Sequence, residues 1–284
     1  MKNIKALLAL FAIIVLPVSC SSDGESSDGR DNSIRQRVVS KITFDSDEWD
    51  EADEYSFRYD SYGRITRVTH KTISDSNAEL CHYERYVYGS NGILTMSDDD
   101  DYSCEATLNR DGYISEIYFD WDDFSELYTF SYDKSGRLIT NEYLQEDSYD
   151  DYYYHVTYTY NWNSGNIVEC EYYMTESDDD HYAANIQYSY NSKLMNMVNL
   201  DLNVVLGNYF EFLYIDFEIC GYWGDGLCGQ KSRNLLTSAE IFTRNESYRY
   251  DINWHYDEDG YPVSADIIDD DDDSCRVTIE YDDK

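Results

Sequence analysis

The side chains with the clearest capacity for chemistry in this 284-residue chain are clustered carboxylates. Acidic stretches recur at residues 47–54, 98–101, 120–123, 146–151, 178–180 and 269–273. Such clusters could bind Ca²⁺, which takes about six to eight oxygen ligands. The weak candidates for a metal site are Asp98, Asp99, Asp100, Asp101, Asp178, Asp179, Asp180, Asp269, Asp270 and Asp271. None of the runs has the D-x-D-x-D-G spacing of a calcium loop, so we expect solvated loops and no metal site.

Catalytic chemistry is not indicated. The histidines are scattered, and no G-x-S-x-G, H-E-x-x-H or glycine-rich phosphate loop is present. With 58 acidic residues in the chain, the closeness of two carboxylates carries no information about glycosidase chemistry. His155, His181 and His255 fall on the polar side of alternating stretches, where solvent exposure is expected. We therefore predict a non-enzymatic protein without a cofactor.

The N-terminus has the pattern of an export signal. Lys2 and Lys5 precede an apolar run over residues 6–18. This run is too short to span a membrane, but its length suits the core of a signal peptide. We expect the signal peptide to cover residues 1–19.

Cys20 is the predicted site of lipid attachment. The sequence Pro17-Val18-Ser19-Cys20 and the polar tract that follows resemble a bacterial lipoprotein lipobox, although Pro17 stands where leucine is usual. Acyl chains on Cys20 would anchor the protein to a membrane surface, with residues 20–35 as a flexible Ser/Asp/Gly tether. Ordinary secretion, with Cys20 near an unrelated cleavage point, is the alternative.

Six further cysteines follow at positions 81, 104, 170, 220, 228 and 275. In an exported protein an even number permits three disulfides, and buried free thiols are the alternative. The possible local disulfide joins Cys220 to Cys228, because three glycines make the segment between them pliable. Cys104 and Cys275 each begin a strand on its apolar face. No C-x-x-C motif is present, so we do not expect a zinc site.

The net charge excludes one class of partner. The formal charge is −37, and removal of residues 1–19 takes away two lysines and no acid, which makes it −39. Such a surface repels phosphate backbones, so no nucleic-acid role is expected. The 31 tyrosines and the strand patterns described next argue against disorder, which this composition would otherwise suggest.

A repeated hairpin must position these side chains. Residues 59–65 and 132–138 are its clearest copies, and each has an aspartate three positions before a glycine. This spacing predicts a type I turn followed by glycine at positive φ, and hence antiparallel strands on either side. The predicted turn glycines are Gly63, Gly92, Gly112, Gly136, Gly165 and Gly260. A seventh copy, residues 190–194, has lost its glycine.

The strands that enter these turns alternate between apolar and polar residues, as at residues 55–59, 128–132, 156–160 and 250–256. Period-two alternation is typical of half-buried antiparallel strands. Ile65 and Val68 are three residues apart and cannot share a face of a regular strand, so we expect a β-bulge beside Gly63.

The fold class predicted is all-β, an antiparallel up-and-down meander that forms a curved sheet or a barrel-like domain over residues 36–284. Alternate turns of a meander fall on opposite edges, so the glycine turns should line one edge and the acidic loops the other. The stretch from about residue 194 to 249 interrupts the repeat.

A family resemblance rests on the order of these motifs. The stretches YDSYGRITRV and YDKSGRLITNEY are similar to YD-type repeats of bacterial surface proteins. Together with NLDLN, GQKSRNL and YDEDGYPVSA, they resemble an uncharacterised family of Bacteroidetes-type lipoproteins whose domain of unknown function is described as porin-like. The resemblance covers about residues 36–284. It implies a curved or closed sheet behind a lipid anchor, with no catalytic residues to transfer.

Three functions remain open. The favoured one is a lipid-anchored, outer-membrane protein that faces the cell surface or periplasm and binds an extracellular glycan or envelope protein, for example through Tyr222 and Trp223. The second is a calcium-dependent structural module that uses the acidic loops. The third is a barrel embedded in the outer membrane, with its aromatic face toward lipid.

Overall fold

The computed structural model describes residues 37–46, 51–74, 77–97, 103–120, 124–147, 153–177, 181–210, 226–271 and 273–283. Residues 36–284 form one compact unit. The strands of its first half are β1 Arg37–Ser46, β2 Glu51–Tyr59, β3 Ile65–Ser74, β4 Asn77–Tyr88, β5 Ile93–Ser97, β6 Ser103–Leu108, β7 Ile114–Asp120 and β8 Phe124–Tyr132. The remaining elements are β9 Leu138–Asp147, β10 Tyr153–Asn163, β11 Asn166–Glu176, β12 His181–Met195, α1 Leu202–Tyr209, β13 Asn234–Phe242, β14 Ser247–Tyr256, β15 Pro262–Asp269 and β16 Ser274–Asp283.

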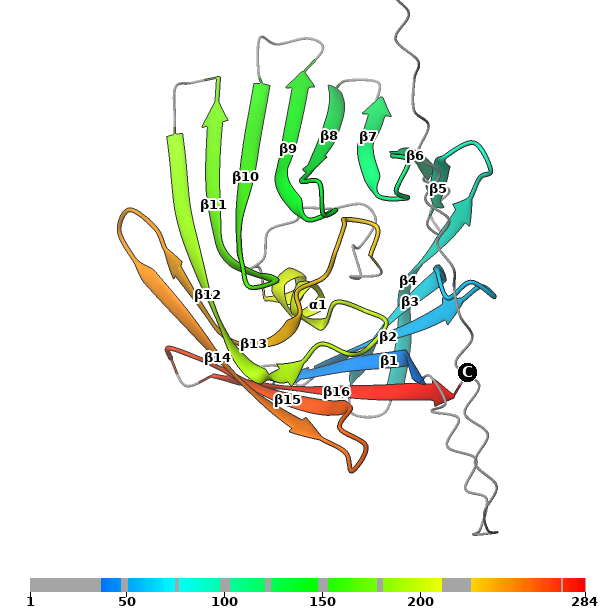
Figure 1. Ribbon diagram of the computed structural model, residues 1–284, viewed down its shortest axis with the longest axis vertical. Helices are drawn as coiled ribbons and strands as arrows, with labels where there is room; N and C mark the ends of the chain where they lie inside the picture. The colour runs from blue at the N-terminus through cyan, green and yellow to red at the C-terminus, as the bar shows by residue number, and fades with distance from the viewer. Residues whose placement is uncertain are drawn as a thin grey trace, which may run out of the picture. The chain divides into compact units, whose positions relative to one another are not determined.

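The strands form a closed antiparallel barrel (Figure 1). Each strand pairs with its neighbours in the sequence, and β1 pairs with β16 from Arg37 opposite Asp283 to Ser46 opposite Cys275. The predicted all-β meander is confirmed, and the sheet closes on itself. Closure removes the two free edges that an open meander would expose.

The inside of the barrel is apolar and the outside is polar. In β16, Cys275, Val277 and Ile279 are buried, whereas Arg276 and Glu280 between and beyond them are exposed. The inward residues of the strands form a single hydrophobic core that includes residues of α1, and Figure 1 shows α1 inside the barrel. Within the described residues, no helix is long and apolar enough to cross a membrane.

Four of the six predicted glycine turns share one construction. At the first of them, the Gly63 N–H donates to the Asp60 carbonyl at 3.1 Å, and the Asp60 carboxylate accepts from the N–H groups of Tyr62 and Arg64 at 2.8 and 3.0 Å. Asp133, Asn109 and Asp257 hold three other turns in the same way. The six predicted turn glycines have φ between +77° and +87°. Only glycine adopts such angles without a steric penalty.

A β-bulge follows the first glycine turn, as the spacing predicts. Tyr59 lies opposite Ile65 and Arg58 opposite Arg67, which leaves Thr66 without an opposite residue. The extra residue restores the side-chain parity, so Ile65 and Val68 are both buried.

The seventh repeat is not a hairpin turn. Residues 190–194, which have lost the glycine, lie inside β12, and the chain then leaves the barrel wall to form α1 before it returns as β13. The pairing of β12 with β13 shifts register between Tyr190 and Met195. Without a residue suited to positive φ, no tight hairpin forms at this position.

Candidate functional site

The first candidate site is a plug at the glycine-turn end of the barrel. We define the plug as residues 196–210 and 226–233, the described parts of the connection between β12 and β13. Most of its apolar side chains, among them Leu200, Leu202 and Leu206, are almost fully buried and belong to the barrel core, whereas Met197 is exposed. The helix α1 is therefore held by packing inside the barrel, since eight residues are too few to form a stable helix alone.

Asp201 is the polar centre of the plug. Its side chain caps α1 by accepting from the Asn203 N–H at 3.2 Å, and it also accepts from the Asn196 side chain at 2.8 Å and the Ser232 N–H at 3.0 Å. Burial raises the pKa of Asp201 to about 6, although these donors and the charge of Lys231 oppose the rise. Desolvation lowers the pKa of Lys231, whose ammonium group donates to the Val198 carbonyl.

Three buried asparagines tie the plug to the barrel wall. Asn203 donates to the Asn234 carbonyl and accepts from the Leu236 N–H, both at 2.8 Å. Asn234 in turn exchanges two hydrogen bonds with Asn166 of β11, at 2.9 and 3.1 Å. These side chains bond to backbone groups at the start of β13, where the pairing with β12 shifts register.

The plug also contacts the turns that surround it. The N–H groups of Gln230 and Arg233 donate to the carbonyls of Gly136 and Gly165, each at 2.8 Å. Gly229 has φ +97°, and a Cβ atom there would lie 2.6 Å from the Gly136 carbonyl oxygen. This end of the barrel therefore has no room for a side chain at Gly229.

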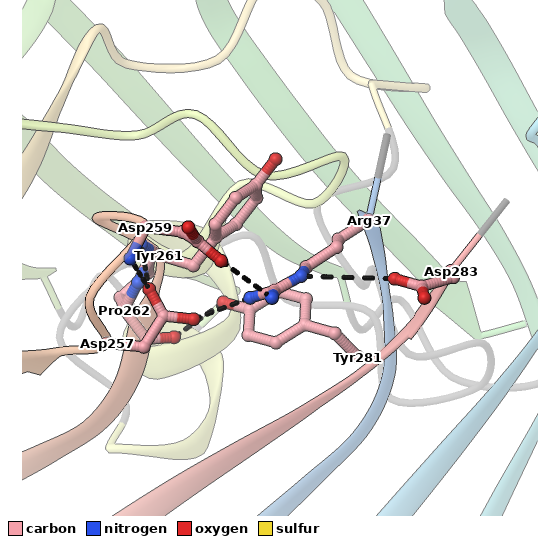
Figure 2. A network of polar contacts seen from close by, with 7 residues as sticks. All are labelled: Arg37, Asp257, Asp259, Tyr261, Pro262, Tyr281 and Asp283. Atoms are coloured by element: carbon pink, nitrogen blue, oxygen red, sulfur yellow. Dashed lines mark hydrogen bonds and ion pairs between the residues drawn. The ribbon is translucent and has the colours of Figure 1, made fainter. Parts of the chain in front are cut away.

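The closing seam of the barrel carries an ionic network (Figure 2). Arg37 of β1 donates to Asp257 at 2.5 Å and to Asp259 at 2.9 Å in the β14–β15 turn, and lies 4.0 Å from Asp283 of β16. Burial opposes ionisation of Asp257, but the Tyr261 N–H and the Arg37 guanidinium lower its pKa. Because these groups are partly exposed, we assign the network a modest role in holding the seam.

The second candidate site is a notch in the barrel wall beside β12. β12 pairs with β11 from His181 onward, but with β13 only from Asn185, which lies opposite Phe242. In Figure 1, β12 extends past the tip of the β13–β14 hairpin, which leans away from it. A groove of about 790 Å³ lies there, lined by residues 171–173, 181–185 and 242–245.

Exposed aromatic rings surround this notch. Tyr173, Tyr182 and Phe242 are 48%, 43% and 39% exposed, in contrast to the buried tyrosines of the core. Tyr173 stacks on His181 with ring centroids 6.0 Å apart. These rings are available to a binding partner.

The inner wall of β8 and β9 holds buried polar groups that lack partners. Asn141 is fully buried, and neither polar atom of its side chain has a hydrogen-bond partner among the described residues. Glu126 accepts from the Tyr143 hydroxyl at 2.9 Å through Oε1, while its Oε2 has no such partner. These groups are buried, so a partner from solution can reach the exposed groove beside β12 more easily than this inner wall.

The described residues of one acidic loop, 269–271 and 273, connect β15 to β16 at the end of the barrel opposite the glycine turns. Asp98–Asp101 and Asp178–Asp180 fall outside the described residues. The Asp269 carboxylate accepts from the N–H groups of Asp271 and Asp273, both at 3.0 Å, as a turn does without a metal. The described residues contain no group of three or more His, Cys, Asp or Glu side chains placed to hold a metal ion.

The remaining candidate residues are placed only in part. Cys20, Cys220, Tyr222 and Trp223 lie outside the described residues, so lipid attachment and the Cys220–Cys228 disulfide stay predictions. Cys104 and Cys170 are buried free thiols, and burial raises the pKa of Cys170 well above its ordinary value. Cys170 is therefore a poor nucleophile.

Sequence reasoning did not identify the plug or the notch. The NLDLN and GQKSRNL segments stand out by composition, but nothing local indicates that Asp201 and Asn203 bond to residues about thirty positions away. One signal was available: Asp201 directly precedes the apolar run of α1, which is a helix N-cap pattern.

Comparisons with known proteins place the fold. Residues 57–264 match the model of a family described as a domain of unknown function (DUF4595) with porin-like fold. A porin-like protein from Bacteroides vulgatus ATCC 8482 superposes with a TM-score of 0.62 at 14% identity, covering 87% of this chain and 99% of that one. A porin-like protein from Bacteroides uniformis ATCC 8492 gives 0.61 at 15% identity, covering 86% and 96%. No curated protein matches the chain.

Proposed function

Because the chain belongs to the family described as a domain of unknown function with porin-like fold, we propose that it is a non-catalytic binding or structural protein of the cell envelope. Acyl chains on Cys20 hold it at the outer membrane, on the cell-surface or periplasmic side, and its barrel binds an extracellular glycan or another envelope protein. The observation that carries this proposal is a polar outer wall around an apolar, plugged interior.

The outer wall favours an anchored barrel over an embedded one. A barrel embedded in lipid presents an apolar band outward, and an outward arginine or lysine at mid-membrane costs about 2–4 kcal/mol. Here the outward face of β14 carries Arg249, Asp251, Asn253 and His255, all exposed. The outward face of β16 carries Arg276, Thr278 and Glu280, also exposed, so immersion of this side of the barrel in lipid would be strongly unfavourable.

The plug argues against conduction through the barrel. In a porin the interior is polar and filled with water. In this protein residues of α1 and of the surrounding strands form one hydrophobic core, and the plug bonds to the turns at Gly136 and Gly165. A porin-like fold is thus used here as a rigid support rather than as a channel.

The calcium-dependent module is the weaker alternative. The ordinary turn geometry of Asp269, which needs no cation, gives it no support. A calcium site adds stabilisation at concentrations far below those that screen repulsion.

Membrane fractionation of a bacterial host that processes lipoproteins tests the anchor. The native chain and Ser22→Ala, a matched change in the tether, should incorporate labelled palmitate and remain in the membrane pellet after a high-salt wash. Cys20→Ser should incorporate none and leave the pellet, because acyl chains supply the membrane affinity. If Cys20→Ser still needs detergent for release, the barrel itself is embedded and the proposal is wrong.

A further inference from the structure

The step between β12 and β13 leaves part of a strand edge open. Residues His181 to Ala184 pair with β11 through Thr175 to Tyr172, but the pairing with β13 begins only at Asn185. Beyond Phe242 the chain turns into β14, and the Thr243 N–H donates to the Glu246 carbonyl at 2.9 Å within that turn. The edge of residues 181–184 that faces the groove therefore has no strand beside it among the described residues.

An open edge is suited to one kind of partner. Unpaired N–H and C=O groups of an exposed strand edge are a template for another strand, and proteins bind extended peptides by adding them to such edges. The groove of about 790 Å³ lies where β13 would run if it continued past Phe242. We propose that this notch binds an extended, positively charged polypeptide segment, which pairs with residues 181–184 of β12 as an added strand.

The side chains around the edge favour apolar residues at alternate positions of that segment. Tyr173 and Phe242 have outward parity on β11 and β13, and Ala183 lies between them, opposite Tyr173. The small Ala183 leaves room for a side chain of the partner between the two rings. Tyr182 follows the inward parity of β12, so the next partner residue would face its ring.

The charge of this protein determines which kind of peptide can bind as the added strand. The chain carries a formal charge of −37, so a second copy of itself would be repelled, as would an acidic peptide. Glu171 lines the notch, and Glu169 lines an adjoining groove of about 310 Å³ on the same outer face. Glu240 also lines that groove, but it is already paired with Arg249, so the negative charge offered to a partner comes from Glu171, Glu169 and the net charge of the chain. Among the described residues that line the notch, Arg244 is the one lysine or arginine, and it lies in the β13–β14 turn at the rim. The surroundings therefore favour a basic segment.

This inference names the partner for the binding role proposed above and rests on that role, but not on the lipid anchor. The test uses the full chain in detergent and a fluorescent synthetic peptide of alternating lysine and valine, followed by anisotropy. Ala183→Trp, which fills the space between Tyr173 and Phe242, should weaken binding at least about tenfold. Thr278→Trp, on the exposed face of β16, should leave it unchanged.

The backbone contribution is tested separately. A peptide N-methylated at alternate residues keeps its charge but loses donors, and should bind at least about tenfold more weakly. Hydrogen exchange at residues 181–184 should slow when the unmodified peptide is added. Equal binding by the N-methylated peptide, or exchange that does not change, would overturn strand addition. Displacement of the peptide by a neutral malto-oligosaccharide would assign the notch to a glycan and would also overturn it.

The two proposals can fail independently. If the peptide does not bind while Cys20→Ser leaves the membrane as expected, the notch assignment alone is wrong. If the peptide binds but Cys20→Ser remains embedded, the anchored envelope role fails and the strand-addition site stands.

Discussion

The plug and the notch are built on the same barrel and differ in how their backbone groups are satisfied. In the plug, buried asparagine and aspartate side chains bond to the backbone of Ser232 and of the start of β13. At the notch, the edge of residues 181–184 is left open and aromatic rings are exposed around it. The difference separates a part of the barrel built for rigidity from a part available for binding.

The plug and the notch differ because buried polar side chains are present in the plug to bond the backbone, whereas the strand edge at the notch is exposed to solvent. A buried backbone group must find a hydrogen bond, and Asn203 and Asp201 of the plug supply it to Asn234 and Ser232. At the surface, water or a partner can satisfy the same kind of group, so an open edge can persist. We expect mutations in the plug to change stability and mutations in the notch to change binding.

The largest expected effect is that of Asn203→Ala. The change leaves the Leu236 N–H and the Asn234 carbonyl buried without partners, at about 1–3 kcal/mol each, so the free energy of unfolding should fall by about 4 kcal/mol. Asn253→Ala, on the exposed face of β14, is the control and should change it by less than about 0.5 kcal/mol. Urea denaturation measures both, and similar losses would remove the distinction between the plug and the outer wall.

A second effect concerns pH. The folded-state pKa of Asp201 is about 6, above the value of about 3.9 expected in the unfolded chain. Between these values the folded state binds more protons, so this group stabilises the protein below about pH 4 and loses that contribution as pH rises to about 6, by about 3 kcal/mol. Asp201→Asn should abolish this part of the pH dependence.

The measurement is the difference in unfolding free energy between the native chain and Asp201→Asn from pH 4 to pH 7. Asp266→Asn, which changes a partly exposed carboxylate whose pKa is lowered by hydrogen bonds from His255 and Arg276, is the control. Its contribution is lost only as pH falls below about 4, so its difference should stay constant over this range. A difference for Asp201→Asn that is constant with pH would contradict the assignment.

A smaller effect separates backbone strain from steric conflict. Gly229 and Gly260 both have positive φ, at +97° and +85°, so alanine is strained at either position. A Cβ atom at Gly229 would also meet the Gly136 carbonyl oxygen at 2.6 Å, whereas nothing lies within 4 Å at Gly260. Gly229→Ala should therefore be about 2 kcal/mol more destabilising than Gly260→Ala. Equal melting temperatures for the two variants would show that the plug backbone shifts to relieve this contact.

The smallest expected effect is on the notch itself. Tyr173→Ser removes a ring that is 48% exposed, so the free energy of unfolding should change by less than about 1 kcal/mol. Tyr158→Ser, which removes a ring that is 1% exposed, should cost about 3 kcal/mol or more. Thermal denaturation compares the two. A large loss of stability in Tyr173→Ser would mean that the notch is part of the structural core.

Much of the barrel wall could be predicted from the sequence. The alternation at residues 156–160 indicates which side chains face inward, and Val156, Tyr158 and Tyr160 are buried. The spacing of Ile65 and Val68 indicates a bulge, which the pairing of β2 with β3 contains. These features depend on neighbouring residues, whose side chains alternate with period two along a strand.

The helix α1 and the polar plug could not be predicted in this way. The residues of α1 are apolar and partly β-branched, and an isolated helix of this length is unstable. It exists because Asp201 caps it and the barrel core surrounds it, and Asp201 is itself held by Ser232 about thirty positions later. The loss of glycine at residues 190–194 marks where the repeat ends but not what replaces it.

The sequence by itself determined the hairpins, the inward and outward faces, the bulge and the strongly acidic surface. These follow from the steric limits on φ, from the pleat of a strand and from net charge, all of which act locally or by composition. Only the tertiary structure decided that Arg37 and Asp283 meet to close the barrel, that α1 packs in its interior and that β12 extends beyond β13 at the notch. Each of these depends on contacts between residues distant in the chain, because closure, packing and relative strand length are settled only when all strands are in place.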